Sequence, residues 1–274
     1  FFSVFNTDII KSVELYKGGI PPEYGGRLSS ILDIRTCEGN LEKIKGEGGI
    51  GLISSKLVIE GPIVKNKASF IVSGRRTYAD LMLPLAKDTN ARKGKFYFYD
   101  LNAKVNYIIN QKNRIFVSGY FGRDVNRFAR TFKMNYGNAT ISMRWNHIFS
   151  PKYFSNLTLL YSNYNYVFGV PEGVTGFLWN SSITSYMLKN DHTIYLSSTN
   201  TIKYGLQSLY LKLHPATIRS EIESFITDFK LPNNYALENS FYISHRYQRD
   251  KLYIIWGLRM SLFQNIGRGI SRGI

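Results

Sequence analysis

The connections between the strand-like segments of this sequence alternate between short and long along most of the chain. The short connections fall at residues 64–67, 110–114, 150–152, 198–200 and 248–250. The long ones lie between them, at residues 77–95, 128–136, 170–180 and 214–234. A soluble β-sandwich has no reason to alternate in this way, whereas a transmembrane β-barrel has tight turns on one side and long loops on the other. The alternation therefore predicts an all-β chain that forms a transmembrane antiparallel β-barrel.

The segments themselves follow the two-residue period of a β-strand and not the period of a helix. We expect about eleven strands, lying approximately at residues 41–51, 54–63, 68–78, 96–109, 115–128, 137–149, 154–168, 181–197, 201–213, 236–247 and 251–264. Most are long enough for a tilted strand to cross ~30 Å of hydrocarbon. An odd number of strands leaves an open edge, which is costly in lipid because its backbone groups are unpaired. We therefore interpret the chain as a fragment of a larger barrel.

The alternation of side chains predicts which residues contact lipid and which line the lumen. The apolar face is expected to contact lipid and includes Ile141, Met143, Trp145, Trp256, Leu258 and Met260. A charge on that face costs ~2–4 kcal/mol at mid-membrane, so charged residues of the opposite face are expected in the lumen. These lumen candidates are Lys56, Glu60, Arg75, Lys104, Arg144 and Arg259. They pair with carboxylates inside the barrel, are solvated, or contact cargo.

Aromatic residues gather near the expected strand ends, where a barrel has interfacial girdles. Examples are residues 96–99 and the group Tyr161, Tyr164 and Tyr166. The chain carries 35 basic and 19 acidic residues, a formal charge of +16, spread over both kinds of connection and the polar strand faces. This charge suits a phosphate-rich membrane surface and anionic cargo. Because it does not form one stripe, it argues against a nucleic-acid partner.

Residues 1–40 differ in character from the rest of the chain. A short strand ends near Tyr16, a corner rich in glycine and proline occupies residues 17–27, and a second strand follows at residues 28–35. Residues 10–19 (IKSVELYKGG) and 24–34 (YGGRLSSILDI) resemble the end of the plug domain of TonB-dependent outer-membrane receptors, in the form found in Bacteroidota. The likeness continues through the barrel start, over residues 47–63 and 68–78, and returns at residues 236–243 and 257–259.

This resemblance implies that residues 1–40 are the C-terminal end of a plug domain. Residues 41–274 would then be the N-terminal half of a barrel of about 22 strands. It further implies that Tyr24, Gly25, Gly26 and Arg27 form a plug-folding element, with Arg27 a candidate to pair with the barrel wall.

The function that the resemblance implies is active import of a scarce nutrient across the outer membrane of a Gram-negative bacterium. The cargo classes are siderophore, cobalamin, glycan or peptide. The expected partners are TonB of the inner-membrane energy-transducing complex, reached through an upstream segment, then outer-membrane lipid and lipopolysaccharide, and a surface lipoprotein. No covalent chemistry is implied, so we expect neither an enzyme nor a cofactor.

The remaining motifs give weaker functional signals. Residues 46–51 match G-x-G-x-x-G, but a dinucleotide site needs a helix after it, and residues 52–63 read as a strand. The four histidines, His147, His192, His214 and His245, sit in separate segments without a metalloenzyme signature. Of these, His214 is expected in a long outer loop, as an ordinary loop residue or a ligand contact. The lone Cys37 excludes a disulfide framework and is expected to be structural or incidental.

Two other functions remain open at this point. One is a passive porin, or an outer-membrane assembly or adhesion barrel with the same architecture. The other is a soluble, basic, β-rich binding module, which would be monodisperse without detergent. The cargo is not defined by the sequence, because selectivity resides in loops and plug apices.

Overall fold

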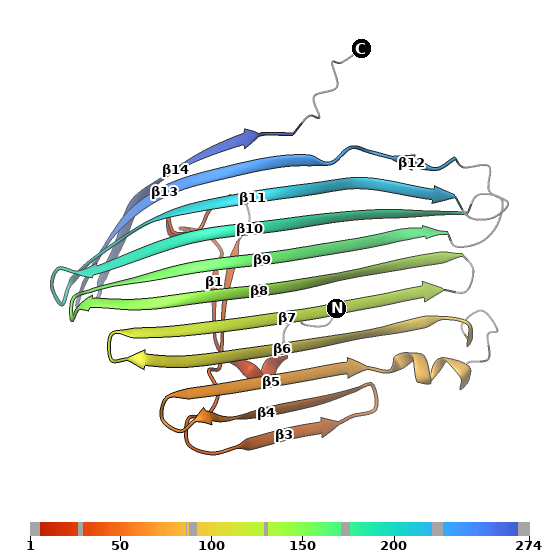
Figure 1. The fold of residues 1–274 in the computed structure, drawn as a ribbon, viewed down its shortest axis with the longest axis horizontal. Helices are drawn as coiled ribbons and strands as arrows, with labels where there is room; N and C mark the ends of the chain where they lie inside the picture. Colours follow the sequence, from red (N-terminus) through yellow and green to blue (C-terminus); the bar gives the residue numbers. More distant parts are fainter. Residues whose placement is uncertain are drawn as a thin grey trace, which may run out of the picture.

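The computed structural model consists of one large antiparallel β-sheet and a two-stranded sheet that packs against it (Figure 1). It describes residues 6–26, 30–85, 87, 92–128, 131–170, 176–220 and 227–267. The main strands of the large sheet are β3 (Lys45–Ile50), β4 (Ser54–Val64), β5 (Ala68–Thr77), β6 (Lys95–Asn110), β7 (Asn113–Phe128), β8 (Phe132–Ser150), β9 (Tyr153–Val170), β10 (Phe177–Tyr195), β11 (Asn200–Ser220), β13 (Asn234–Arg249) and β14 (Leu252–Asn265). They pair in chain order, and the short β12 (Phe229–Lys230) adds to β11.

The sheet does not close on itself within the described residues. Its order runs from β3 at one edge to β14 at the other, and every neighbouring pair is antiparallel. The eleven main strands agree with the number expected from the alternating pattern. The connections near one end of the sheet are short throughout, at residues 65–67, 111–112, 151–152, 196–199 and 250–251. We call this the short-turn end.

The small sheet is made by β1 (Ile10–Tyr16) and β2 (Ile31–Thr36), which pair antiparallel and run across the strands of the large sheet (Figure 1). Short 3-10 helices cover η1 (Thr7–Ile9), η2 (Ala79–Leu81) and η3 (Leu83–Leu85). In the part of the chain that the structure describes, no helix is both long enough and apolar enough to cross a membrane. We call residues 6–26 and 30–38 the inner segment, and the face of the large sheet that it packs on the inner face.

An apolar core joins the inner segment to the large sheet at a single point. Ile9 packs with Val58 of β4 and Ile71 of β5, and the partly buried Cys37 packs against this cluster. Cys37 also donates its backbone N–H to the Ile9 carbonyl at 2.8 Å. Many of the other contacts between the described residues of the inner segment and the large sheet are polar.

Several strands are longer than the sequence pattern predicts and the loops between them are correspondingly short, whereas β3 is shorter than the expected 41–51. The expected connection 128–136 reduces to residues 129–131, because β8 already begins at Phe132. His214 was expected in a loop, but it lies inside β11, where its imidazole contacts Asn233 Oδ1 at 2.7 Å and Thr217 Oγ1 at 2.8 Å. At the start of β8 the apolar residues Phe132 and Met134 lie on the inner face, opposite to Ile141 and Met143, so the apolar face changes along the strand.

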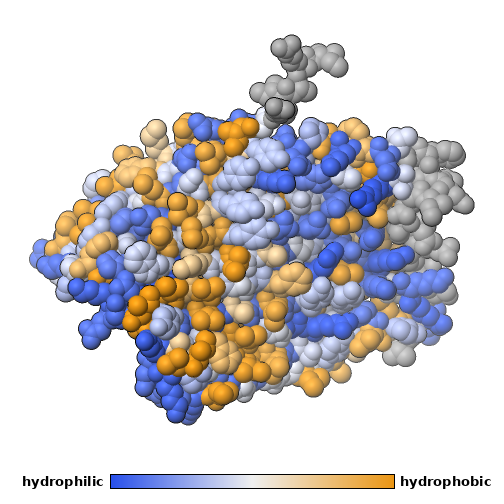
Figure 2. Space-filling model, in the orientation of Figure 1, coloured by the Kyte–Doolittle hydropathy of each residue, from blue (hydrophilic) through white to orange (hydrophobic). Residues whose placement is uncertain are grey.

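The outer face, opposite the inner segment, carries an apolar band between two aromatic rows. The tyrosine row crosses four strands and comprises Tyr161, Tyr186, Tyr210 and Tyr235, with successive ring centroids 5.2, 6.1 and 6.3 Å apart. The short-turn row lies near the other end and comprises Trp145, His147, Phe149, Tyr153, His192 and Tyr204, again as successive ring contacts. Figure 2 shows apolar side chains gathered toward the short-turn end and hydrophilic ones toward the opposite end.

The expected girdle was therefore partly wrong. Tyr161 belongs to the tyrosine row, but Tyr164 and Tyr166 pair with Asn138 and Tyr136 of β8 and lie on the inner face. Likewise only the odd-numbered members of residues 96–99 lie on the outer face, because neighbouring residues of a strand point to opposite faces.

Candidate functional site

The candidate site is the contact between the inner segment and the inner face of the large sheet. Residues directly opposite each other in an antiparallel pair share a face. Lys56 lies opposite Arg75, and Arg75 lies opposite Asp100, so these side chains share the inner face. The same registers place the six lumen candidates from the sequence on this face.

Two of these candidates form ion pairs near β4 and β5. The Lys56 ammonium lies 2.6 Å from a carboxylate oxygen of Asp8, which belongs to the inner segment. The Arg75 guanidinium lies 2.7 Å from Asp100 on the neighbouring strand and also stacks on Phe98 at 4.8 Å. Lys56 therefore ties the inner segment to the wall, whereas Arg75 ties two wall strands together.

Three basic side chains surround one buried phenyl ring farther along the inner face. Arg144, Arg114 and Lys104 lie 4.5, 4.8 and 5.6 Å from the centre of the Phe116 ring. The Arg114 guanidinium pairs with Glu38 at 2.6 Å. The Lys104 ammonium donates to the Thr36 carbonyl at 3.0 Å, so two of these wall cations bind the inner segment.

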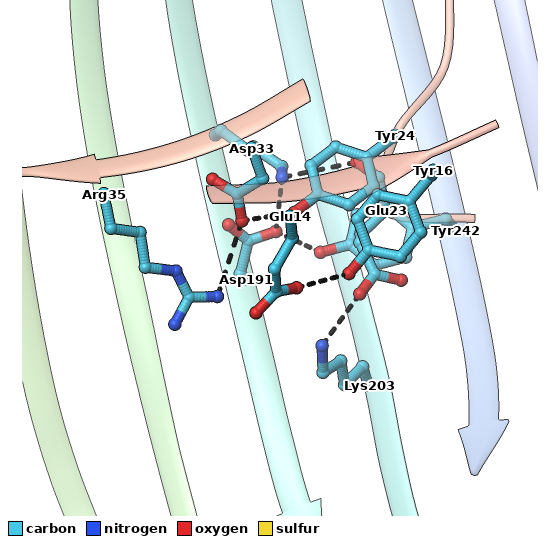
Figure 3. Close-up of polar contacts among 10 residues, drawn as sticks. Glu14, Tyr16, Glu23, Tyr24, Asp33, Arg35, Asp191, Lys203 and Tyr242 are labelled. Atoms are coloured by element: carbon cyan, nitrogen blue, oxygen red, sulfur yellow. Dashed lines mark hydrogen bonds and ion pairs between the residues drawn. The ribbon is translucent and has the colours of Figure 1, made fainter. Parts of the chain in front are cut away.

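A second polar cluster joins the corner of the inner segment to β10, β11 and β13 (Figure 3). Lys203 pairs with Glu23 at 2.7 Å, and Lys189 pairs with Asp191 at 3.1 Å. Tyr242 is only 1% exposed, and its hydroxyl donates a hydrogen bond to the Asp191 carboxylate. Lys203 thus joins the corner to β11, and Lys189 of β10 also donates to the Glu23 carbonyl at 3.4 Å, whereas the contacts of Asp191 lie within the wall.

Two tyrosines of the inner segment complete the cluster in Figure 3. The Tyr24 hydroxyl donates to Asp33 at 2.9 Å, and burial, followed by this hydrogen bond, raises the pKa of Tyr24 above its usual value. The Tyr16 hydroxyl donates to Glu14 at 2.7 Å, and this hydrogen bond is the main cause that raises the pKa of Tyr16 to about 12. The two rings lie 5.6 Å apart. Because both pKa values are raised, both hydroxyls stay protonated as donors at neutral pH.

Two glycines of the corner, Gly25 and Gly26, sit against side chains of the wall that a Cβ would displace. A Cβ on Gly25 would lie 2.1 Å from Nε of Arg259. Gly26 has a φ of +76°, and a Cβ there would lie 3.2 Å from the Glu238 carboxylate. Arg259 itself donates to the Pro22 carbonyl at 3.3 Å. Of the predicted motif, Arg27 lies outside the described residues.

A cavity of about 1190 Å³ lies between the inner segment and the wall. Its lining carries seven basic residues and five acidic ones: Lys11, Arg35, Lys104, Arg144, Lys189, Lys203 and Arg246, with Glu14, Glu23, Asp33, Glu38 and Asp191. Arg144 opens into this cavity, and the structure shows no hydrogen bond or ion pair for it within the described ranges. Of the six lumen candidates, Lys104 and Arg144 line this cavity, whereas Lys56, Glu60, Arg75 and Arg259 lie elsewhere on the inner face.

The six apolar residues predicted to contact lipid lie on the outer face, between 39% and 74% exposed. The two tryptophans among them have polar neighbours. Trp145 donates its indole N–H to Asn113 at 3.1 Å, and the Trp256 ring lies 5.5 Å from the His245 ring at an angle of 60°. Among the described residues no group of His, Cys, Asp or Glu side chains is arranged to hold a metal ion.

Sequence reasoning missed the acidic side of this contact. Glu23, Asp8 and Glu38 each pair with a wall cation, but none was singled out. A usable signal existed, because residues 1–40 hold five acidic and four basic residues, whereas the rest of the chain holds 14 acidic and 31 basic. Lys189 and Lys203 were also missed, because β10 and β11 show no clear apolar alternation over much of their length.

Comparison with solved structures agrees with this architecture. The chain is similar to the pyoverdine outer membrane receptor FpvA from Pseudomonas aeruginosa PAO1, with a TM-score of 0.71 and 12% identity over 94% of this chain and 46% of that one. It is also similar to the siderophore receptor PirA from Acinetobacter baumannii (TM-score 0.68, 12% identity, 93% and 44% covered). The copper transporter OprC gives a TM-score of 0.69 at 8% identity, with 92% and 43% covered.

The chain has the fold of these receptors. The fold class predicted from the sequence is therefore confirmed, and the predicted outer-membrane localisation agrees with the kind of protein that shares it. The chain spans less than half the length of these structures. Neither a protein-family model nor a curated protein matches the sequence.

Proposed function

We propose that this chain is part of a TonB-dependent receptor that imports a scarce nutrient across the outer membrane of a Gram-negative bacterium. In this proposal residues 1–40 are the end of the plug, in the form found in Bacteroidota, and residues 41–274 are the first half of the barrel. The fold shared with siderophore receptors and a copper transporter supports transport over catalysis. Siderophore, metal, cobalamin, glycan and peptide remain the cargo classes.

The observation that carries the proposal is the polar character of the contact between inner segment and wall. Three ion pairs cross it, Lys56–Asp8, Arg114–Glu38 and Lys203–Glu23, whereas its apolar core is the small cluster around Ile9. Partly exposed ion pairs contribute little free energy each and exchange readily with water. A plug held in this way is retained at rest and is remodelled when force is applied through TonB.

Arg144, for which the described residues supply no hydrogen-bond or ion-pair partner, favours an anionic cargo. Arg144 stacks on Phe116 and reaches the cavity beside Lys104 and Arg114, and Glu38 is the carboxylate that pairs within this group. Carboxylate or phosphate groups on a cargo are strong partners for a guanidinium with this access. In this role Arg144 would contact cargo, and Lys104 and Arg114 would hold the plug.

Nutrient uptake in the native host tests the proposal. A deletion of the full-length gene should abolish growth on one member of a panel of iron chelates, copper, cobalamin, glycans and peptides. A tonB deletion should abolish uptake of the same nutrient, and the purified full-length barrel should be closed in planar bilayers. The alternative, a passive porin, predicts uptake that is independent of TonB and an open conductance. An assembly or adhesion barrel predicts no uptake phenotype.

The proposed partners follow from the same placement: TonB through an upstream segment, outer-membrane lipid and lipopolysaccharide, and a surface lipoprotein. A pull-down of the full-length protein with the periplasmic domain of TonB tests the first. Loss of binding after removal of the upstream segment would support it, and unchanged binding would contradict the proposed route.

A further inference from the structure

Two apolar grooves meet on the outer face between the short-turn row and the tyrosine row. The first has a volume of about 330 Å³ and is lined by Ile109, Asn113, Ile115, Met143, Trp145, Leu157 and Leu159. The second has a volume of about 450 Å³ and extends to Tyr161, Tyr186 and Tyr210. Met143 and Leu159 line both, so the two form one continuous slot along β7 to β10.

Along β9 the slot runs from Leu157 to Tyr161, four residues, which corresponds to about 13 Å. Across the strands it reaches from Ile109 of β6 to Tyr210 of β11. It ends at the tyrosine row, beyond which the outer face becomes polar: Asn163 donates to Thr184 at 2.9 Å. The slot therefore offers an acyl chain an apolar surface that is bounded by polar groups.

The other end of the slot is polar and basic. Asn113 lines the groove there. Its side-chain oxygen accepts a hydrogen bond from the Trp145 indole at 3.1 Å and lies 2.7 Å from Nδ1 of His147. Lys112 directly precedes Asn113 and is exposed. Lys67, also exposed, lies over the ring of Tyr107, 5.6 Å from its centre, and Tyr107 stands opposite Ile115 of the slot.

This charge is part of a wider bias at the short-turn end. The short connections, residues 65–67, 111–112, 151–152, 196–199 and 250–251, together hold five lysines and one acidic residue, Asp250. Basic residues placed next to an aromatic row and an apolar surface are the arrangement that attracts anionic lipid headgroups. The basic residues and the apolar slot together therefore favour a lipid with an anionic headgroup.

We propose that a glycerophospholipid with an anionic headgroup binds this site. One acyl chain occupies the slot between Trp145 and the tyrosine row, and the phosphate lies at the short-turn end between Lys67 and Lys112. The inference rests on the proposed outer-membrane placement and not on transport. It assigns a specific lipid site to a surface that would otherwise be general bilayer contact, and it places the headgroup on the short-turn side.

The test is native mass spectrometry of the purified full-length protein in detergent, titrated separately with dioleoyl phosphatidylglycerol and dioleoyl phosphatidylcholine. We expect one phosphatidylglycerol to remain bound at concentrations where phosphatidylcholine does not. A double variant Lys67→Gln/Lys112→Gln should weaken phosphatidylglycerol binding about 25-fold, about fivefold per lysine, and leave phosphatidylcholine binding unchanged. The matched control is Lys212→Gln, an exposed lysine of β11 two residues beyond Tyr210, which should change neither.

A slot variant tests the other half of the site. Met143→Trp fills the shared part of the groove without a change of charge, so it should weaken binding of both lipids. Equal retention of both lipids by the unmodified protein would overturn the inference, as would an effect of Lys212→Gln as large as that of the double variant. Displacement of phosphatidylglycerol by lipid A would also overturn it, because that would assign the slot to the opposite leaflet.

The outcomes also distinguish a failure of the lipid site from a failure of the proposed outer-membrane placement. A full-length protein that is monodisperse without detergent contradicts the outer-membrane placement itself. A detergent-soluble barrel that shows no lipid preference contradicts only the lipid site.

Discussion

A single arginine on the outer face should distinguish a lipid-facing wall from an exposed wall in water. Met143 lies between Trp145 of the short-turn row and Ile141, and 41% of its surface is accessible. In water, replacement of a half-exposed side chain of this kind changes stability by about ±0.5 kcal/mol. At the bilayer midplane an arginine costs about 2–4 kcal/mol, whereas near the interface it costs about 0–1 kcal/mol.

The neighbouring positions supply the controls. Met143→Arg should destabilise the folded full-length protein by about 2–4 kcal/mol, a shift of roughly 30- to 1000-fold in the folding equilibrium. Trp145→Arg lies two residues nearer the short-turn end, about 7 Å along the strand, so the cost of its charge should be smaller. Ser142→Arg adds the same charge on the inner face, where Ser142 lines the cavity, and should stay within about 1 kcal/mol.

The assay is reversible urea unfolding of the full-length protein in phospholipid vesicles, followed by tryptophan fluorescence and heat-modifiable gel mobility. Trp145→Arg removes one fluorophore, so the gel readout decides that variant. A loss below 0.5 kcal/mol for Met143→Arg, or equal losses for Met143→Arg and Ser142→Arg, would refute the assignment of the two faces. Spin labels at the same positions should report lipid at 143 and water at 142.

Three further variants test the inner face. In Gly25→Ala the new Cβ would lie 2.1 Å from Nε of Arg259, so this variant should lower the free energy of unfolding by about 1–3 kcal/mol. The control Gly18→Ala has no atom within 4 Å of the new Cβ and should change it by about zero. Urea unfolding measures both variants. A double-mutant cycle on Glu23 and Lys203 should give a coupling of about 1 kcal/mol that falls with salt, and zero coupling would contradict the pair. Folding raises the pKa of Tyr16 from 10.0 to about 12. Its protonated hydroxyl therefore contributes its full stabilisation below pH 10 and loses it between about pH 10 and 12. Tyr16→Phe should remove this loss from a plot of unfolding free energy against pH.

The strand count and the two faces of the central strands could be predicted from the sequence, because one face of these strands is apolar and the other carries charge. Around Met143 the alternation is therefore clear. Beyond the tyrosine row, outer-face residues such as Asn163 and Thr184 are polar, and at the start of β8 the apolar side chains of Phe132 and Met134 lie on the inner face. The apolar face thus changes along β8, which is why this strand was predicted too short.

The contact between inner segment and wall could be predicted only in outline. The corner glycines were recognisable, but the reason for them lies in Arg259 and Glu238, more than 200 residues away in the chain. Glu23 pairs with Lys203 across 180 residues. Such pairings depend on the curvature and register of the whole sheet, and a single sequence gives no local signal for either.

The length of the strands beyond the tyrosine row has a consequence for how the protein meets its surroundings. β9, β10 and β11 continue for nine or ten residues past Tyr161, Tyr186 and Tyr210, about 30 Å along the strand. In the proposed outer-membrane placement these strand ends would form a stiff, hydrogen-bonded collar beyond the tyrosine row, with amide side chains such as Asn165 and Asn180 on its outer face. An antibody raised against the collar, or a phage tail fibre that binds it, would recognise the folded conformation of the strands. Its binding would be lost when the protein is boiled and would be retained when the loops are deleted.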